Sequence, residues 1–328
     1  MSVASIGTGG GAPARLRSLL ARNDVFVILV CLGVVASLLS PDFLSAGNLS
    51  NLLTQSALLG ILSIGQFMVI VTGGFDLSVA AVMALSSVVL ARHASIGLAP
   101  MALVSLAVGA GCGLFNGLVI AEGRVQPLIA TLAMMGIARG LAFSLSEKSI
   151  LVHDPLLTWL RDMDGFLSAP TLVWIVATAI AFVWLRTTRQ AIHLYAIGGS
   201  EQTARLAGVA IDRVKIGVYT VSGMLSGLAG VVLVIRSSSG VPLGGLGWEL
   251  DSIASIVIGG ASLFGGEGRL IPAMAGVVIY QMIANVMNLV GLDPFYQNIV
   301  RAAVIILAVG ASILRQPSGV RRNILGRP

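Results

Sequence analysis

The chain has 328 residues, of which 56% are hydrophobic and 10% are charged, and its mean hydropathy is +0.95. A soluble globular domain is about a quarter charged because it needs polar groups to cover its surface, so this composition excludes an ordinary soluble protein. The net charge of +6 does not indicate nucleic-acid binding, since there is no dense basic stripe with interleaved aromatic residues. Basic membrane edges that face anionic lipid account for it.

Ten apolar runs follow one another along the chain, separated by short polar breaks. Most run for about 15–25 residues, which suits helices that cross about 30 Å of hydrocarbon. We therefore predict an all-α polytopic membrane protein with about ten transmembrane helices. The expected spans are Val25–Ser40, Leu52–Val71, Leu77–Ala91, Ile96–Ala121, Pro127–Leu145, Ala169–Leu185, Ile216–Ile235, Ser252–Phe264, Leu270–Leu289 and Phe295–Leu314.

Two of these spans are short for a full crossing and rich in Ser, Gly or Ala: Leu77–Ala91 and Ser252–Phe264. Broken or re-entrant helices are tolerated at membrane depth where protein or a watery cavity covers the backbone. The sequence leaves open whether these two are short crossings or re-entrant segments.

The basic residues predict the orientation. If the N-terminus is cytoplasmic and the spans alternate, fourteen Lys and Arg residues lie in cytoplasmic segments and four lie outside, with Arg139 and Arg301 inside spans. This asymmetry satisfies the positive-inside rule and favours an even number of spans with both termini cytoplasmic. The cytoplasmic set is Arg15, Arg17, Arg22, Arg124, Arg186, Arg189, Arg205, Arg213, Lys215, Arg269, Arg315, Arg321, Arg322 and Arg327, and the outer set is Arg92, Lys148, Arg161 and Arg236.

The domain organisation follows from these spans. We expect a disordered cytoplasmic tail over residues 1–22, a transmembrane domain over 23–315 with a long cytoplasmic loop over 186–215, and a basic cytoplasmic tail over 316–328. Arg15–Arg22 followed by an apolar run resembles a signal peptide, but its removal would leave an odd number of spans. Cys31 and Cys112 both fall in apolar spans, so we do not expect a disulfide framework. The histidines are scattered along the chain at no metal-ligand spacing, so we expect neither a metal site nor another cofactor.

The longest cytoplasmic loop contains a short predicted helix, Glu201–Ala207. Ser200 is a good N-cap, Glu201 places negative charge at the positive end of the helix dipole, and Gly208 suits the residue after the helix. Seven residues are too few to hold a helix in water. The segment therefore packs either against the rest of this chain or against a partner protein.

Several stretches of the chain resemble the ribose/xylose/galactoside-type permeases of ATP-binding cassette importers. They are "VTGGFDLSVAAVMALSS", "NGLVIAEGRVQPLIATLAMMGIARGLA", "AIGGSEQTARLAGV" with "DRVKIGVYTVSGMLSGLAGVVL" after it, and "GWELDSIASIVIGGASLFGGEG". Together they extend from about Gly65 to Gly268, in order and at plausible spacing. Phe75, Gln126 and Trp248 depart from the family pattern. These departures bear on which cargo is carried more than on whether the chain belongs to the family.

This resemblance implies an inner-membrane subunit that pairs with a second copy of itself and with a cytoplasmic ATPase. An extracytoplasmic sugar-binding protein would deliver a monosaccharide or a related polyol. The segment with Gly199, Glu201, Arg205 and Gly208 would be the helix that docks in the ATPase. Membrane lipid would be the remaining partner, and no nucleic-acid partner is expected.

The lysines support this division of labour. The chain has two, Lys148 and Lys215, and neither follows a glycine. A phosphate-binding loop of the form GxxxxGK[ST] is therefore impossible, and ATP has to be bound by another polypeptide. No local nucleophile–base pair suited to catalysis is present, so the chain itself is not expected to be an enzyme.

Polar residues within the spans are candidates for the translocation pathway, because ionisable groups at membrane depth are expensive. Asp76 opens the third span, and Glu249 and Asp251 open the eighth, in the parallel motifs "GGFDLS" and "GWELDS". These acids alternatively cap helix N-termini, and Arg139 and Arg301 alternatively extend to the membrane interface. The full set of pathway candidates is Asp76, Asn116, Arg139, Glu249, Asp251, Asn285, Asn288 and Arg301.

Three other functions remain open from the sequence. The nearest is an ATP-driven permease for branched-chain amino acids or nucleosides. A secondary transporter could use the intramembrane carboxylates as proton or sodium sites. A membrane-embedded enzyme would need a clustered acid–base or metal set, which the motifs do not provide.

Overall fold

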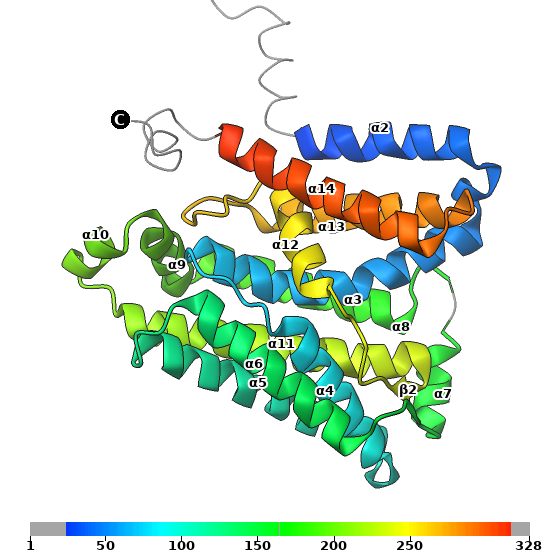
Figure 1. The fold of residues 1–328 in the computed structure, drawn as a ribbon, viewed down its shortest axis with the longest axis horizontal. Coiled ribbons are helices and arrows are strands. Elements are labelled where there is room, and N and C mark those ends of the chain that lie inside the picture. The colour runs from blue at the N-terminus through cyan, green and yellow to red at the C-terminus, as the bar shows by residue number, and fades with distance from the viewer. Residues whose placement is uncertain (1–23, 164, 316–328) are drawn as a thin grey trace, which may run out of the picture.

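The computed structural model describes residues 24–163 and 165–315. The tails predicted over 1–22 and 316–328 lie outside the described residues. Helices dominate the described part (Figure 1). They are α2 (Asp24–Leu39), η1 (Pro41–Leu44), α3 (Ala46–Val71), α4 (Val79–Arg92), η2 (Ala94–Ile96), α5 (Leu98–Ala121), α6 (Pro127–Leu145), α7 (Pro155–Arg161), α8 (Ala169–Thr187), α9 (Arg189–Gly199), α10 (Glu201–Leu206), α11 (Ile211–Ser237), α12 (Trp248–Ile258), α13 (Leu270–Leu289) and α14 (Pro294–Arg315).

Each of the ten predicted spans contains a helix, and α6 and α13 have the predicted bounds. Among the described residues, six helices are long and apolar enough to cross a membrane: α3, α5, α6, α8, α11 and α13. The segments Asp24–Leu39, Val79–Arg92 and Pro294–Gly310 are shorter apolar helices. The prediction of an all-α membrane protein is therefore confirmed.

The eighth span was predicted too far along the chain. Ser252–Phe264 was expected to be one helix, but α12 begins at Trp248 and ends at Ile258. Gly259 and Gly260 follow it, and Gly260 has a φ of +86°, which glycine adopts without a steric penalty. Eleven residues make a helix of about 16 Å, so the helical part of this segment is shorter than the hydrocarbon core is thick.

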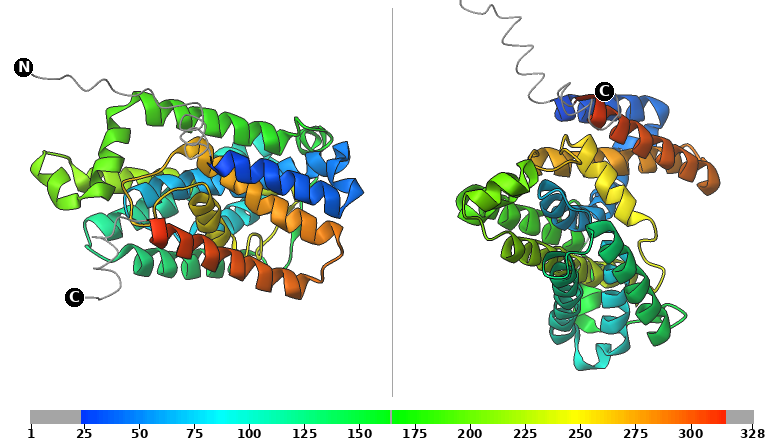
Figure 2. Two further views of the ribbon diagram at one scale, coloured as in Figure 1. Left: turned by 90° about the horizontal axis from the view of Figure 1, so that it is seen from above. Right: turned by 60° about the vertical axis from the view of Figure 1, so that its left-hand side comes forward.

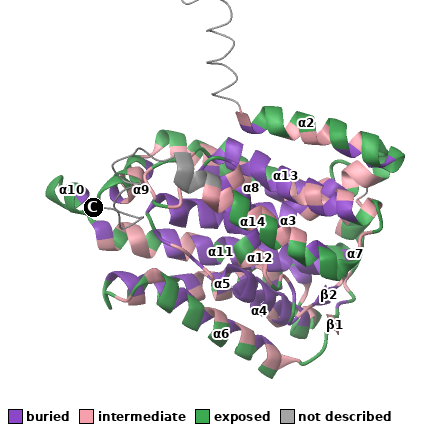
Figure 3. Ribbon diagram, turned by 45° about the horizontal axis from the view of Figure 1, so that its top comes forward, coloured by how far each residue is buried: buried purple, intermediate pink, exposed green. Residues whose placement is uncertain are grey.

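The core of the bundle is α3. It is buried along most of its length (Figure 3), and its side chains Leu58, Ile61, Ile64 and Phe67 are fully enclosed. In lipid the hydrophobic effect does not drive helices together, so van der Waals packing between helices stabilises this arrangement. The outer helix α2 has the opposite character and exposes most of its apolar residues, as expected for a helix that faces lipid.

Glycines bring α5 and α11 into backbone contact. A Cβ on Gly109 would overlap the carbonyl of Gly223, and one on Gly113 would overlap the carbonyl of Tyr219. Gly109 and Gly113 have the GxxxG spacing of one helical turn, which lets two helices pack closely in a membrane. The glycines Gly136 and Gly140 of α6 repeat the spacing but face open space.

The bundle has two distinct ends. Helices α9 and α10 project at one end, and α2 begins and α14 ends toward that same end (Figures 1 and 2). The short α7 and the two-residue strands β1 (Ile150–Leu151) and β2 (Ser239–Gly240) lie at the opposite end. The strands pair antiparallel, with Ile150 opposite Gly240.

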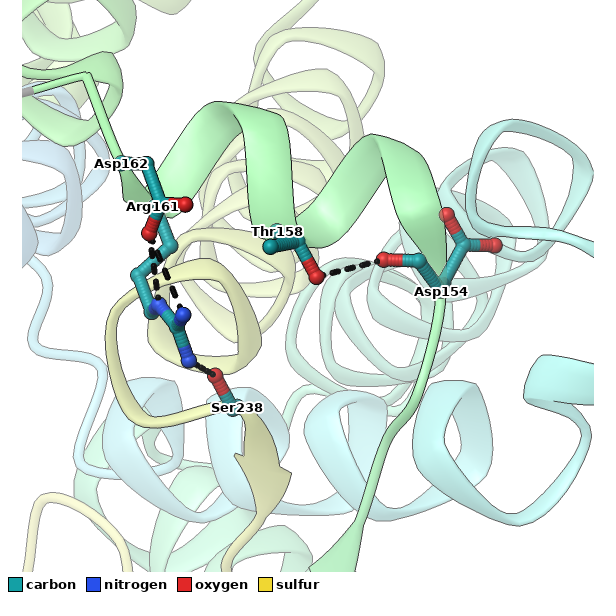
Figure 4. A network of polar contacts seen from close by, with 5 residues as sticks. All are labelled: Asp154, Thr158, Arg161, Asp162 and Ser238. Atoms are coloured by element: carbon teal, nitrogen blue, oxygen red, sulfur yellow. Dashed lines mark hydrogen bonds and ion pairs between the residues drawn. The ribbon is translucent and has the colours of Figure 1, made fainter.

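The end that carries α7 is tied together by polar contacts, and none of it was predicted from the sequence. Asp154 caps α7 by accepting from Leu156 N–H, and its other carboxylate oxygen accepts from Leu98 N–H at the start of α5. The hydroxyl of Thr158 donates to the Asp154 carbonyl, while Arg161 donates to Asp162 and to Ser238 beside β2 (Figure 4). This network fixes the loop between α6 and α8 to the end of α11.

Candidate functional site

The α9–α10 segment is shaped by three local signals. Thr188 caps α9 by accepting from Ala191 N–H, and Ser200 caps α10 by accepting from Thr203 N–H at 3.2 Å. Gly208 has a φ of +82°, and its N–H donates to the carbonyl of Arg205. The predicted short helix is therefore present, over Glu201–Leu206. The preceding helix α9 was not predicted.

Two contacts hold α10 against the bundle. Its one buried side chain, Ala204, packs with Ile197 of α9 and Ile211 of α11. The carboxylate of Glu201 accepts from Lys215 of α11 at 2.7 Å and pairs with Arg205 at 3.5 Å. The hydrogen bond from Lys215 lowers the pKa of Glu201, with partial burial acting against it. These contacts within the chain hold α10 against α9 and α11.

The opposite face of α10 is exposed. Leu206 leaves 84% of its surface exposed, and Arg205 has 52% of its side chain exposed. An apolar side chain at the tip of a projecting helix, next to a cation, is the kind of feature that inserts into a partner's cleft. Leu206 was not predicted as a site residue, because a helix as short as α10 has too few apolar residues to show which of its faces is exposed.

A second site lies at the break between α3 and α4. Asp76 is 1% exposed and accepts three hydrogen bonds. Two come from the N–H and the hydroxyl of Ser78, and the third comes from the hydroxyl of Ser222 on α11 at 2.9 Å. Asn116 of α5 donates to the Ser78 hydroxyl at 3.0 Å. Two predicted residues, Asp76 and Asn116, therefore belong to one buried polar cluster.

The two oxygens of the Asp76 carboxylate share these bonds: Oδ1 accepts twice from Ser78, and Oδ2 accepts once from Ser222. Both carboxylate oxygens are thereby satisfied by uncharged donors. This geometry fits the alternative in which Asp76 caps a helix and fastens α4 to α11.

A third site joins α12, α13 and α14. Asp251 is 8% exposed and accepts a short hydrogen bond from the hydroxyl of Tyr280. Arg301 of α14 lies 3.9 Å from the other carboxylate oxygen, and one third of its side chain is exposed. The predicted residues Asp251 and Arg301 are thus brought together, and Tyr280 between them was not predicted.

The remaining candidates lie apart from these clusters. Asn285 of α13 exchanges two amide hydrogen bonds with Asn48 of α3, at 2.7 and 3.0 Å. Asn288 accepts from Gln297 of α14 at 2.9 Å. Arg139 of α6 donates to the carbonyls of Pro242 and Gly244 before α12.

Glu249 is partly buried in the first turn of α12, on the same helix as Asp251. The eight polar candidates therefore form several separate contacts between helices.

Two buried polar side chains of α3 were missed by the sequence analysis. Ser63 and Gln66 are fully buried, and their side-chain oxygen and nitrogen atoms have no partner within the described protein. Their signal was readable, since both interrupt an apolar run. Buried amides are normally paired, so this stretch of α3 is unusual.

Comparison with known proteins identifies the chain. The model of the family described as the branched-chain amino acid transport system / permease component matches residues 48–309. The chain belongs to this permease family. The match covers α3 to α14 almost completely, including all three sites described above.

Curated relatives align over nearly the whole permease. The ribose import permease protein RbsC of Escherichia coli K12 is 39% identical over 301 residues, 89% of this chain and 93% of that protein. RbsC of Bacillus subtilis 168 is 38% identical over 296 residues, 87% and 90% of the two chains. The L-arabinose transport system permease protein AraH of E. coli K12 is 35% identical over 312 residues, 92% and 94%.

No solved structure matches the chain. The family and the apolar helices together place the permease in the bacterial inner membrane, which it crosses several times.

Proposed function

We propose that the chain is the membrane-spanning subunit of an ATP-driven importer for a monosaccharide or a related polyol. The observation that carries the proposal is the 35–39% identity to ribose and arabinose permeases over about nine tenths of the chain. The family description names branched-chain amino acids, but the aligned relatives are named for the pentoses ribose and arabinose. A sugar is therefore the favoured cargo.

The cargo is tested through the partner that delivers it. An extracytoplasmic binding protein encoded beside this chain should bind a pentose or another monosaccharide by calorimetry. Binding of leucine, isoleucine or a nucleoside, with no heat from any sugar, would favour the alternative permease.

We propose ten membrane segments with both termini cytoplasmic. The fourteen-to-four basic asymmetry supports this topology. The direction of the outer helices supports it too, because the start of α2 and the end of α14 point toward the end of the bundle that carries α10 (Figure 1). Reporter fusions after Ser200 and Arg321 should report cytoplasm, and a fusion after Asp162 should report the outside. A cytoplasmic signal at Asp162 would contradict the topology of the second half.

The energy source would be a separate cytoplasmic ATPase, because this chain has no lysine that could complete a phosphate-binding loop. The docking element would be α10, through Arg205 and the exposed tip at Leu206. Gly199 and Gly208 would set the entry and exit of the helix, and Glu201 would hold its angle through Lys215. A second copy of the permease would complete the assembly.

Charge reversal tests the docking. Arg205→Glu places a carboxylate where we expect an acidic partner group, so ATPase co-purification and sugar uptake should both be lost. Arg213→Glu makes the same charge change at an exposed site on α11 and serves as the matched control, with normal uptake. Normal uptake in Arg205→Glu at normal expression would make α10 an ordinary loop helix.

Gly208→Val provides a second, independent test. A β-branched residue at a φ of +82° costs about 1–2 kcal/mol and would redirect the exit from α10. Membrane insertion should remain normal while ATPase co-purification falls.

The pathway candidates divide into two groups. We propose that Asp251, Arg301 and Glu249 line the route, because all three lie on or against the short α12, and Glu249 and Arg301 retain partial exposure. The same proposal extends to Arg139, which contacts the loop before α12, and to Asn285 and Asn288 on α13. Asp76 and Asn116 would hold the α3–α4 break in position beside it.

A further inference from the structure

Three backbone segments meet where α9 ends. A Cβ on Gly198 would overlap the carbonyl oxygen of Val71, the last residue of α3, and the amide nitrogen of Gly266 in the loop between α12 and α13. The Gly266 N–H donates to that Val71 carbonyl at 2.9 Å. Only glycine allows backbones to approach this closely. We call Val71, Gly198, Gly265 and Gly266 the glycine junction.

The loop side of the glycine junction is equally tight. A Cβ on Gly265 would lie 2.7 Å from the Gly73 nitrogen and 2.9 Å from the Gly198 Cα. Gly265 and Gly266 have φ values of +85° and +73°, a region that favours glycine. The Tyr195 hydroxyl of α9 also donates to the Gly268 carbonyl at 3.1 Å. The α12–α13 loop is thus attached to α9 at two points.

The glycine junction connects the candidate sites along the chain. Helix α10 begins at Glu201, just after Gly198, and the chain reaches Asp76 shortly after Val71. On the loop side, Gly265 and Gly266 lie between α12, which carries Asp251, and α13. One contact therefore borders the docking helix, the α3–α4 break and the segment that follows α12.

A contact between backbones transmits displacement more directly than one between side chains. Long side chains change rotamer and absorb a shift, whereas backbone groups in van der Waals contact have no such freedom. A movement of α9 towards the glycine junction must therefore displace Val71 and Gly266, which a hydrogen bond joins to each other.

We propose that the glycine junction is the joint that passes movement of α10 to both short-helix regions of the permease, with Gly198 and Gly266 as positioning residues. The proposal rests on the proposed docking of an ATPase on α10. It adds which residues inside the membrane subunit receive that movement.

The test uses the full permease reconstituted with its ATPase and its sugar-binding protein in proteoliposomes. Gly198→Ala forces the three segments apart, so sugar transported per ATP hydrolysed should fall about tenfold, within the range of ordinary coupling free energies. The ATPase should still co-purify, because α10 is unchanged. The ratio is informative because a purely structural defect removes transport and hydrolysis together and leaves it constant.

Gly217→Ala is the matched control. It makes the same substitution near the start of α11, where a Cβ would meet nothing within 4 Å, and the ratio should remain normal. Gly266→Ala is the second test variant, since its Cβ would lie 2.9 Å from Gly199, and it too should lower the ratio. Tyr195→Phe removes the hydrogen bond to the Gly268 carbonyl and should lower the ratio of transport to ATP hydrolysis less than the glycine variants do.

The outcomes separate this proposal from the one on which it rests. An unchanged ratio in Gly198→Ala and Gly266→Ala, with the ATPase bound, would overturn the joint and leave the docking intact. Failure of both variants to assemble would also overturn it, because the junction would then serve folding alone. Normal ATPase binding in Arg205→Glu would instead remove the docking proposal.

Discussion

The two short helices α4 and α12 both have an acid close to their start, yet the surroundings of the two acids differ. Asp76 precedes α4, is 1% exposed and accepts only from uncharged groups, on Ser78 and Ser222. Asp251 lies inside the first turn of α12, is 8% exposed and contacts Tyr280 and the cation of Arg301.

The comparison teaches that similar motifs can hold an acid for different purposes. Asp76 accepts from neutral hydroxyls that belong to tightly packed core segments. This favours a structural role, in which Asp76 holds α4 against α11. Arg301 stands on the last described helix, and its side chain is one third exposed. Separating Arg301, on this outer helix, from Asp251 should cost less free energy than separating the core helices that surround Asp76. This difference favours a role in transport for Asp251.

The largest expected effect comes from removing the buried acid. Asp76→Ala leaves the Ser78 and Ser222 hydroxyls without their acceptor, so the free energy of unfolding should fall by about 3 kcal/mol or more. Thermal unfolding of the purified protein in detergent measures this loss. Asp76→Asn, which keeps one carbonyl oxygen, should lose less. A normal melting temperature for Asp76→Ala together with abolished uptake would reverse the assignment of the two acids.

An intermediate effect is expected at the other acid. Tyr280→Phe removes the hydroxyl that donates to Asp251 and should lower the free energy of unfolding by about 1.5 kcal/mol, because Arg301 continues to face the carboxylate. Sugar uptake should fall more steeply than stability does. Tyr296→Phe, at an exposed site on α14, is the control and should change neither. A loss of stability as large as that of Asp76→Ala would make the two sites equivalent.

Much of the fold was predictable because membrane helices depend on composition over long runs. The bounds of α6 and α13 were readable from apolar residues between polar breaks. The cap at Ser200 and the positive φ at Gly208 were readable because each is a local preference.

The rest depended on partners distant in sequence. Ser222 reaches Asp76 across 146 positions, and Asn48 reaches Asn285 across 237; no local pattern specifies such pairs. Helix α9 was missed because a mixed polar and apolar segment of eleven residues is typical of a loop. The end of α12 was missed because the run of apolar and small residues continues past Gly259 and Gly260 to Phe264.

The smallest expected effect concerns Glu201, whose pKa is lowered mainly by Lys215. Since the folded-state pKa lies below the unfolded value of about 4.3, this contact stabilises the fold above that pH and is lost as pH falls through the folded pKa. The carboxylate is 47% exposed, so the contribution should be below about 1 kcal/mol. Glu201→Gln should flatten the acid side of a melting-temperature profile, and an unchanged acid side would exclude this contribution.

The most direct test of the central claim is uptake of a labelled sugar into proteoliposomes. Permease reconstituted with its ATPase and its sugar-binding protein should accumulate the sugar only when ATP is supplied on the ATPase side. Permease alone should accumulate none under a proton gradient. Uptake by the permease alone, driven by that gradient, would contradict the account and identify the chain as a secondary transporter.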